Sequence, residues 1–219
     1  MAIDPRKRQK QLEKKTSKRK AVQAARKDTH AGGISSSARQ IVVAGISPIL
    51  ECLMPEGLFE VGIGNVIVSR KMPNGDIGAS FFLVDVYCLG IKFAFFQTMP
   101  GTEYVRKLAS LGRHETFTRM HPTCARKLVE DAEAYAGEIG FDPHPDYQLA
   151  RKIFGDVDAG ECQTEFTFGK DGKPFFIAGP KDTPARCNKI MDILLKRFGP
   201  DGFHYMMPLD SQNNVPFER

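Results

Sequence analysis

NVIVSRKMPNGDIGASFFLVDVYCL, residues 65–89, is the stretch of the chain that decides its fold. β-Branched and aromatic residues are frequent in Asn65–Met72 and again in Ile77–Leu89, which is typical of strands. The Pro-Asn-Gly-Asp sequence at 73–76 separates them, and Asn-Gly supplies the positive φ angles of a tight hairpin turn. The pattern predicts two antiparallel strands, with Ile91–Phe96 continuing the second strand or starting a third.

The sequence around this hairpin indicates further strands. Residues 40–54 predict a short strand or helix followed by a strand around Ile49–Leu53. A second hairpin is expected from residues 164–168 and 174–177, which flank the turn sequence Lys-Asp-Gly-Lys at 170–173. A sheet assembled from hairpins follows from this reading.

Helical periodicity begins after residue 100. Thr102 is expected to cap a helix that runs through Leu111. The strongest helical pattern is Pro122–Ile139, where apolar residues recur at the i, i+3, i+4 spacing of a buried face. Two more helices are expected at residues 145–154 and 184–198.

This order of elements favours an α+β fold. Strands come before helices and do not alternate with them as in a doubly wound sheet. We expect a mainly antiparallel sheet built from β-hairpins and packed against three to four helices on one face. Residues 38–210 would form this single domain, preceded by a basic arm with a Gly/Ser linker at 1–37 and followed by a polar tail at 211–219.

Charge is distributed very unevenly along the chain. Residues 1–40 carry twelve Lys/Arg against three acidic residues, a net charge of +9. The remaining nineteen basic and twenty-three acidic residues give −4, and the two parts together account for the net charge of +5. Nine cations fall within fifteen residues: Arg6, Lys7, Arg8, Lys10, Lys14, Lys15, Lys18, Arg19 and Lys20.

The basic arm points to a polyanionic partner. It is too poor in apolar residues to bury a face, so it is expected to be disordered or a lone solvated helix. It also lacks aromatic residues for base stacking, so it would contact phosphates and anchor the protein without reading a sequence. Structured RNA, including ribosomal RNA, is the expected partner. Other roles of the arm remain as alternatives: it could be a solubilising tail, a nuclear-import-like signal, a membrane anchor or the binding segment for an acidic protein.

Cysteine usage and hydropathy predict a soluble cytoplasmic protein. The five cysteines, at 52, 88, 124, 162 and 187, are odd in number and widely spaced, so we expect five reduced thiols and no disulfide or zinc framework. Residues 1–30 contain no apolar signal-peptide core, and the most apolar stretch, Phe81–Phe96, is too short to span a membrane. No cofactor is implied, and the oligomeric state stays open.

Asp85 is the most unusual residue of the expected domain, because it interrupts an apolar strand. Such a carboxylate is either functional or bound by cationic or backbone donors. As a functional group it would be a metal ligand of a nuclease-like site, joined by carboxylates such as Glu103, Asp131 or Asp182. As a structural group it would pair with Arg70 or Lys92 or lie on a solvated edge.

Other candidate groups have simpler explanations. Cys88 could be a nucleophile with a histidine as its base, but a packed thiol explains it better. A loose group of residues could hold zinc, although Pro122 disfavours a helical His121–Cys124 pair and turn formation explains the histidines. The members of this group are His114, His121, Cys124, His144 and Asp146.

The loop at 179–182 leads into the last expected helix. Its N–H groups and Lys181 could hold a phosphate. Asp182 or Thr183 would compete for the same donors as a helix cap, which favours simple capping.

Two functions follow from this sequence. The first is a non-enzymatic RNA-binding or ribosome-associated protein whose polybasic arm contacts phosphates. The alternative is a metal-dependent hydrolase acting on nucleic acid, with Asp85 as a candidate metal ligand and the arm as a substrate anchor. A protein-interaction module with an acidic partner is a third class. The sequence assigns no metal site.

Overall fold

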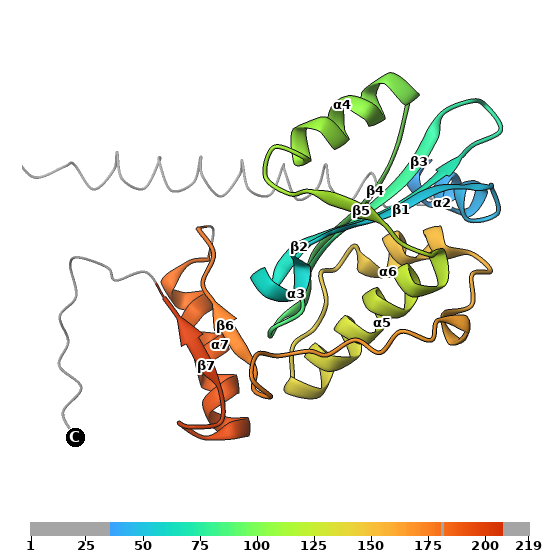
Figure 1. Cartoon of the computed structure of the whole chain (residues 1–219). Coiled ribbons are helices and arrows are strands. Elements are labelled where there is room, and N and C mark those ends of the chain that lie inside the picture. Colours follow the sequence, from blue (N-terminus) through green and yellow to red (C-terminus); the bar gives the residue numbers. More distant parts are fainter. Residues whose placement is uncertain (1–35, 181, 208–219) are drawn as a thin grey trace, which may run out of the picture. The chain divides into compact units, whose positions relative to one another are not determined.

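The computed structural model describes residues 36–180 and 182–207, and they form an α+β fold around a five-stranded antiparallel sheet (Figure 1). The strand order is β4-β3-β2-β1-β5. The bounds of these strands are Ile49–Pro55 for β1, Ile63–Lys71 for β2, Ile77–Asp85 for β3, Gly90–Met99 for β4 and Phe117–Arg119 for β5.

The hairpin expected from residues 65–89 is confirmed. Strands β2 and β3 pair in one continuous register, from Ile63 opposite Asp85 to Lys71 opposite Ile77. Gly75 has the expected positive φ, +87°, in the turn between them, whereas Asn74 does not, so the turn differs from the expected Asn-Gly geometry. The chain turns again after Asp85, so that β4 is a third strand beside β3.

The described helices and short strands complete the fold. Their bounds are Ser36–Gly45 (α2), Leu58–Val61 (α3), Gly101–Leu111 (α4), Pro122–Ile139 (α5), Tyr147–Ala150 (α6), Arg151–Phe154 (η1), Ala159–Glu161 (η2), Phe175–Ile177 (β6), Pro184–Phe198 (α7) and His204–Met206 (β7). Helices α5 and α7 have the bounds that their apolar periodicity predicted. The whole apolar stripe of α5, from Ala125 to Ile139, is buried.

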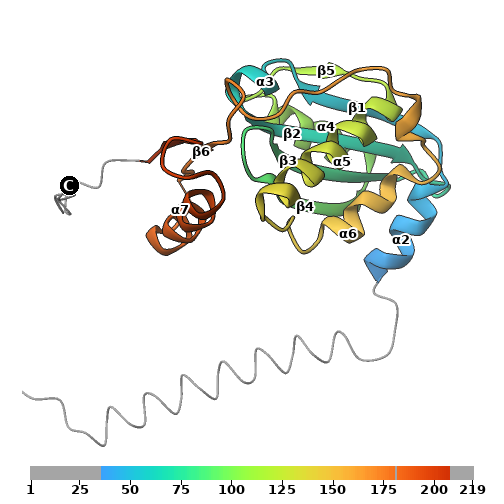
Figure 2. The same cartoon turned by 90° about the horizontal axis from the view of Figure 1, so that it is seen from below.

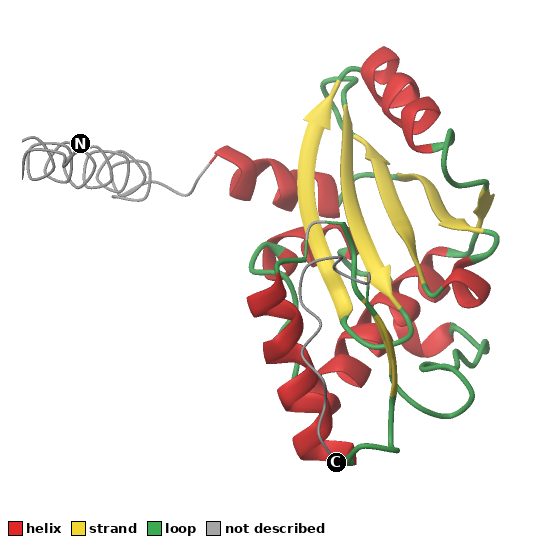
Figure 3. Ribbon diagram, turned by 90° about the vertical axis from the view of Figure 1, so that its left-hand side faces the viewer, coloured by secondary structure: helices red, strands yellow, loops and turns green. Residues whose placement is uncertain are grey.

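Helices cover both faces of the sheet, so the expectation of one covered face is wrong. Phe81 points to the side where Tyr104 of α4 is buried, whereas Phe82 points to α5 and α6 on the other side. Figure 2 looks onto the layer formed by α5 and α6, and Figure 3 shows the strands between helices. The cause is the composition of β2 and β3, which are apolar on both faces and therefore need two layers to exclude water.

Three local expectations also differ from the structure. Thr102 lies inside α4, whose N-cap is Pro100 without a side-chain hydrogen bond. The helix expected at 145–154 consists of α6 followed by the 3₁₀ turn η1. The second hairpin is absent from the described residues: the turn at 170–173 forms, but residues 164–168 are not a strand, and β6 pairs in parallel with β7.

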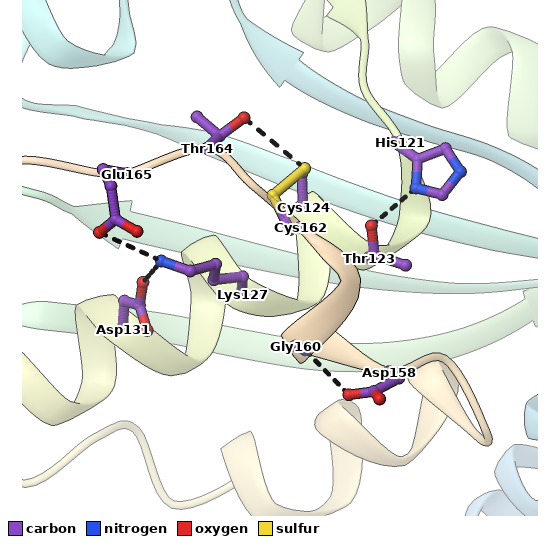
Figure 4. Close-up of a disulfide and its surroundings, with 10 residues drawn as sticks. All are labelled: His121, Thr123, Cys124, Lys127, Asp131, Asp158, Gly160, Cys162, Thr164 and Glu165. Carbon is purple, nitrogen blue, oxygen red and sulfur yellow. Dashed lines mark hydrogen bonds and ion pairs between the residues drawn. A yellow bond between two sulfur atoms is a disulfide. The ribbon is translucent and has the colours of Figure 1, made fainter.

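A disulfide joins Cys124 to Cys162, so the expectation of five reduced thiols is wrong (Figure 4). The Cα atoms of the two residues are 5.0 Å apart although 38 positions separate them in the chain. After η1 the chain returns along α5, and this brings residue 162 beside the first turn of that helix. Cys52, Cys88 and Cys187 are buried free thiols.

Arg70 joins two segments that the sequence did not connect. Its buried guanidinium donates hydrogen bonds to the carbonyl oxygens of Ser47 (2.6 Å), Ile153 (2.7 Å) and Phe154 (2.6 Å). Burial lowers the pKa of Arg70, and Asp156 opposes this effect. Arg70 thereby fastens the loop after α2 and the end of η1 to strand β2, and it is not the partner of Asp85.

The disulfide predicts that only three thiols per chain react with a thiol reagent in denaturant without a reductant. Closing a loop of 38 residues stabilises a fold by restricting its unfolded chain. Cys162→Ser is therefore expected to lower the free energy of unfolding by about 2–4 kcal/mol, measured by urea denaturation.

Reductant supplies the control for this prediction. It should destabilise the wild-type protein by a similar amount and leave the Cys162→Ser variant unchanged. Five reactive thiols in the untreated protein would contradict the disulfide.

Candidate functional site

Asp85 caps the turn between β3 and β4. Its Oδ1 accepts hydrogen bonds from the N–H groups of Tyr87 (3.1 Å) and Cys88 (2.9 Å), and the side chain is buried. Burial raises the pKa of Asp85 to about 6, although the charge of Lys92 and the backbone donors act in the opposite direction. A structural role held by backbone donors fits this geometry, whereas a solvated edge does not. The ion-pair partner of Lys92 is Asp182, so the expected pairing with Asp85 is replaced by a longer-range effect of its charge.

The carboxylates proposed as partners of Asp85 are engaged elsewhere or exposed. Asp131 is 2.9 Å from Lys127, and Asp182 is 3.5 Å from Lys92. Glu103 lies on the surface in the first turn of α4. Across residues 36–180 and 182–207, no group of three or more His, Cys, Asp or Glu side chains is placed to hold a metal ion.

Cys88 is a packed thiol. It is fully buried in a cluster with Leu89 and Phe176, and burial, with Asp85 as a second cause, raises its pKa above the ordinary value of a thiol. A protonated thiol without solvent access is a poor nucleophile. The structure gives Cys88 a role in packing the β3–β4 turn.

The residues considered for zinc are not brought together. Cys124 is in the disulfide, and His121 Nδ1 is 2.7 Å from the Thr123 hydroxyl at the start of α5. His144 Nδ1 accepts a hydrogen bond of 3.2 Å from the N–H of Asp146. Turn and helix-start roles explain both histidines, as the residue pattern suggested.

The loop before α7 is held by its own side chains. Thr183 caps the helix by accepting a hydrogen bond from the N–H of Arg186. Asp182 accepts one from the N–H of Gly179 (2.9 Å) and forms ion pairs with Lys92 and Arg186. These contacts confirm capping by Thr183 and leave a carboxylate where a phosphate would bind.

The nine cations of residues 6–20 lie outside the described residues.

The clearest candidate site in the described part of the chain is an open pocket of about 1080 Å³ that the sequence did not indicate. Elements far apart in the chain supply its walls. Met54 comes from β1, Phe59 and Glu60 come from α3, and Met120 and His121 come from the link between β5 and α5.

The remaining wall is a segment that we call the strap, residues 156–171, which follows η1. Its pocket-facing residues include Phe166, whose ring stacks on Phe59 at 5.9 Å. Cys124 of α5 also lines the pocket, so the disulfide links the α5 wall to the strap (Figure 4). The disulfide therefore holds two of the pocket's walls, α5 and the strap, together.

The sequence of the strap wall carries an ambiguous signal. Residues 164–168 read Thr-Glu-Phe-Thr-Phe, an alternation that predicts a half-buried strand. In the structure, Phe166 and Phe168 point to α3 and α5 instead, where they stack on Phe59 and Tyr135. Alternating apolar residues can therefore indicate a segment that lies on an apolar surface without pairing to another strand.

Comparisons with protein-family models, with curated proteins and with solved structures find no match to this chain. None of the described helices is both long and apolar enough to cross a membrane.

The Asp85 geometry predicts losses of stability of different size for two substitutions. Asp85→Asn keeps an oxygen that accepts from the N–H groups of Tyr87 and Cys88, so it should cost little stability at pH 7. Asp85→Ala leaves both N–H groups without their acceptor and should lower the free energy of unfolding by about 1–3 kcal/mol.

The pH dependence of stability provides a second measurement. Because the pKa of Asp85 is raised to about 6 in the folded chain, the protonated carboxyl stabilises the fold at low pH, and this contribution is lost as the pH rises from about 4 through 6. Urea denaturation should show Asp85→Asn gaining stability relative to wild type over that range. A constant difference would contradict the raised pKa.

Proposed function

We propose that this protein is a non-enzymatic RNA-binding protein that associates with structured RNA, such as that of the ribosome, through its basic N-terminal residues. The observation that carries the proposal is the net charge of +9 on residues 1–40, beside −4 on residues 41–219. Such a segment neutralises phosphates and releases condensed counterions, which drives binding without sequence recognition. A cytoplasmic location would give it access to this partner.

The domain that follows the basic residues is expected to fold without them. The buried core of the described residues begins at Ile41, and its clusters are formed by the sheet and its helices. Residues 40–219 also form a compact unit of their own. A variant lacking residues 1–34 is therefore expected to fold, and RNA binding can be tested without loss of the domain.

The hydrolase alternative gains no support from the described site. Asp85 is occupied by the N–H groups of its own turn, and its proposed carboxylate partners lie elsewhere. The charge of residues 1–40 is what supports binding, and the described geometry of Asp85 adds no support for hydrolysis.

RNA binding should depend steeply on salt and be lost on deletion of residues 1–34. With up to nine phosphates neutralised by residues 6–20, the affinity should fall by several orders of magnitude between about 50 and 300 mM salt. Fluorescence anisotropy with a structured RNA measures both effects, and sedimentation with ribosomes tests the partner.

Two charge variants of the full chain sharpen this test. Replacing the nine cations of residues 6–20 by glutamine should flatten the salt dependence. Lys196→Gln with Arg197→Gln, which removes two exposed charges from the last turn of α7, should change it little. Unchanged RNA affinity after deletion of residues 1–34 would exclude the proposal.

A further inference from the structure

Two aromatic rings that line the pocket beside the disulfide, Tyr87 and Phe166, each have a lysine of this chain near one face. The Lys170 ammonium lies 5.3 Å from the ring centre of Tyr87 and 5.8 Å from that of Phe175. Lys127 lies 5.5 Å from the ring centre of Phe166. The faces of such rings carry negative electrostatic potential, so they favour positively charged groups.

The rim of the pocket is acidic. Glu60, Glu165 and Asp171 line it together with a single lysine, Lys170, and Lys127 beside Glu165 brings the sum of these charges to −1 when His121 is neutral. Among the described residues, Glu60 and Asp171 have no ion-pair partner, whereas Glu165 lies 3.8 Å from Lys127. This charge opposes the phosphates of RNA and matches a cationic ligand.

The interior of the pocket accommodates an apolar group. Met54, Phe59, Met120 and Phe166 are half-buried side chains that line it. Its volume of about 1080 Å³ leaves room for a large side chain with neighbouring backbone. Methionine surfaces adapt to side chains of different shapes, which suits a peptide ligand.

The strap also presents unused backbone groups. Within the part of the chain that the structure describes, no backbone–backbone hydrogen bond involves residues 163–168, whereas Gly169 N–H donates to the carbonyl of Val86. Thr164, Glu165 and Thr167 of this segment are exposed and line the pocket. A peptide lying in the pocket would find both N–H donors and carbonyl acceptors along this wall.

We propose that the pocket is the binding site for a basic peptide segment of a partner protein. A large apolar side chain of the peptide inserts between Met54, Phe59 and Met120. Lysine or arginine residues on either side of it lie near Glu60 and Asp171. None of the pocket residues belongs to residues 6–20, the proposed RNA contacts, and the charge of the pocket is of the opposite sign.

Two synthetic peptides test the charge preference on the full chain. One is an acetylated and amidated seven-residue peptide with a central phenylalanine and a lysine on each side of it. The other has glutamate in place of lysine. The lysine peptide should bind at least about tenfold more tightly, a difference of about 1.4 kcal/mol. Methyl NMR signals of Met54 and Met120 should shift on binding, while that of Met99, buried under α4, should not.

Matched variants locate the charge. Glu60→Gln with Asp171→Asn should bring the two peptides to nearly equal affinity, and asparagine tolerates the positive φ of 53° at position 171. Glu138→Gln, at an exposed position in the last turn of α5, should leave the preference intact. Phe166→Ala should weaken binding of the lysine peptide without removing the charge preference.

Several results would overturn the proposal. Equal binding of both peptides would do so, as would a lysine peptide that leaves Met54 and Met120 unshifted at about 1 mM, the weak end of specific recognition. Shifts of these signals on deletion of residues 1–34 would show that the chain's own basic residues fill the pocket. Displacement of the peptide by RNA would make the pocket a nucleic-acid site. Loss of RNA binding in the variant lacking residues 1–34 tests only the proposed RNA-binding function and does not test the peptide site.

Discussion

The constraint behind this fold is that its central strands are apolar on both faces. Residues of β2 and β3 are buried whichever side they point to, so one layer of helices would leave half of their apolar surface in water. Helix α4 closes one side, and α5 with α6 closes the other. The return of the chain along α5 then creates the strap and the pocket. The candidate site is in this sense a consequence of how the sheet is covered.

Two buried charged groups stand at opposite ends of the β2–β3 pair, and both are held mainly by backbone. Arg70 binds three carbonyl oxygens, and Asp85 accepts from N–H groups of its own turn. A charge without such partners would be costly to bury. Arg70 holds the segments at Ser47 and at residues 153–154, and Asp85 holds the β3–β4 turn. None of these segments is part of the five-stranded sheet. Their placement explains why a carboxylate inside an apolar run need not mark an active site.

Local pattern was enough to predict much of the fold. The β2–β3 hairpin, α5 and α7 follow from turn residues and apolar spacing that act over a few positions. The disulfide could not be predicted, since Cys124 and Cys162 meet only after the chain reverses along α5. The pocket was missed for the same reason: Met54, Phe59 and Phe166 come from segments that only the fold places together. The one-face expectation failed because it was drawn from the order of strands and helices, which does not reveal that both faces of β3 are apolar.

The Cys124–Cys162 bond makes the redox state part of the pocket's structure. Besides this bond, the described contacts of the strap include ring stacking at Phe166 and Phe168, a hydrogen bond from Arg126, the hydrogen bond from Gly169 N–H to Val86 and an exposed ion pair of Glu165. Exposed ion pairs stabilise weakly, so the bond is the strongest single link between the strap and α5. In a reducing cytoplasm such bonds are seldom permanent. The compartment in which this chain resides therefore determines whether the strap stays covalently linked to α5 beside the pocket.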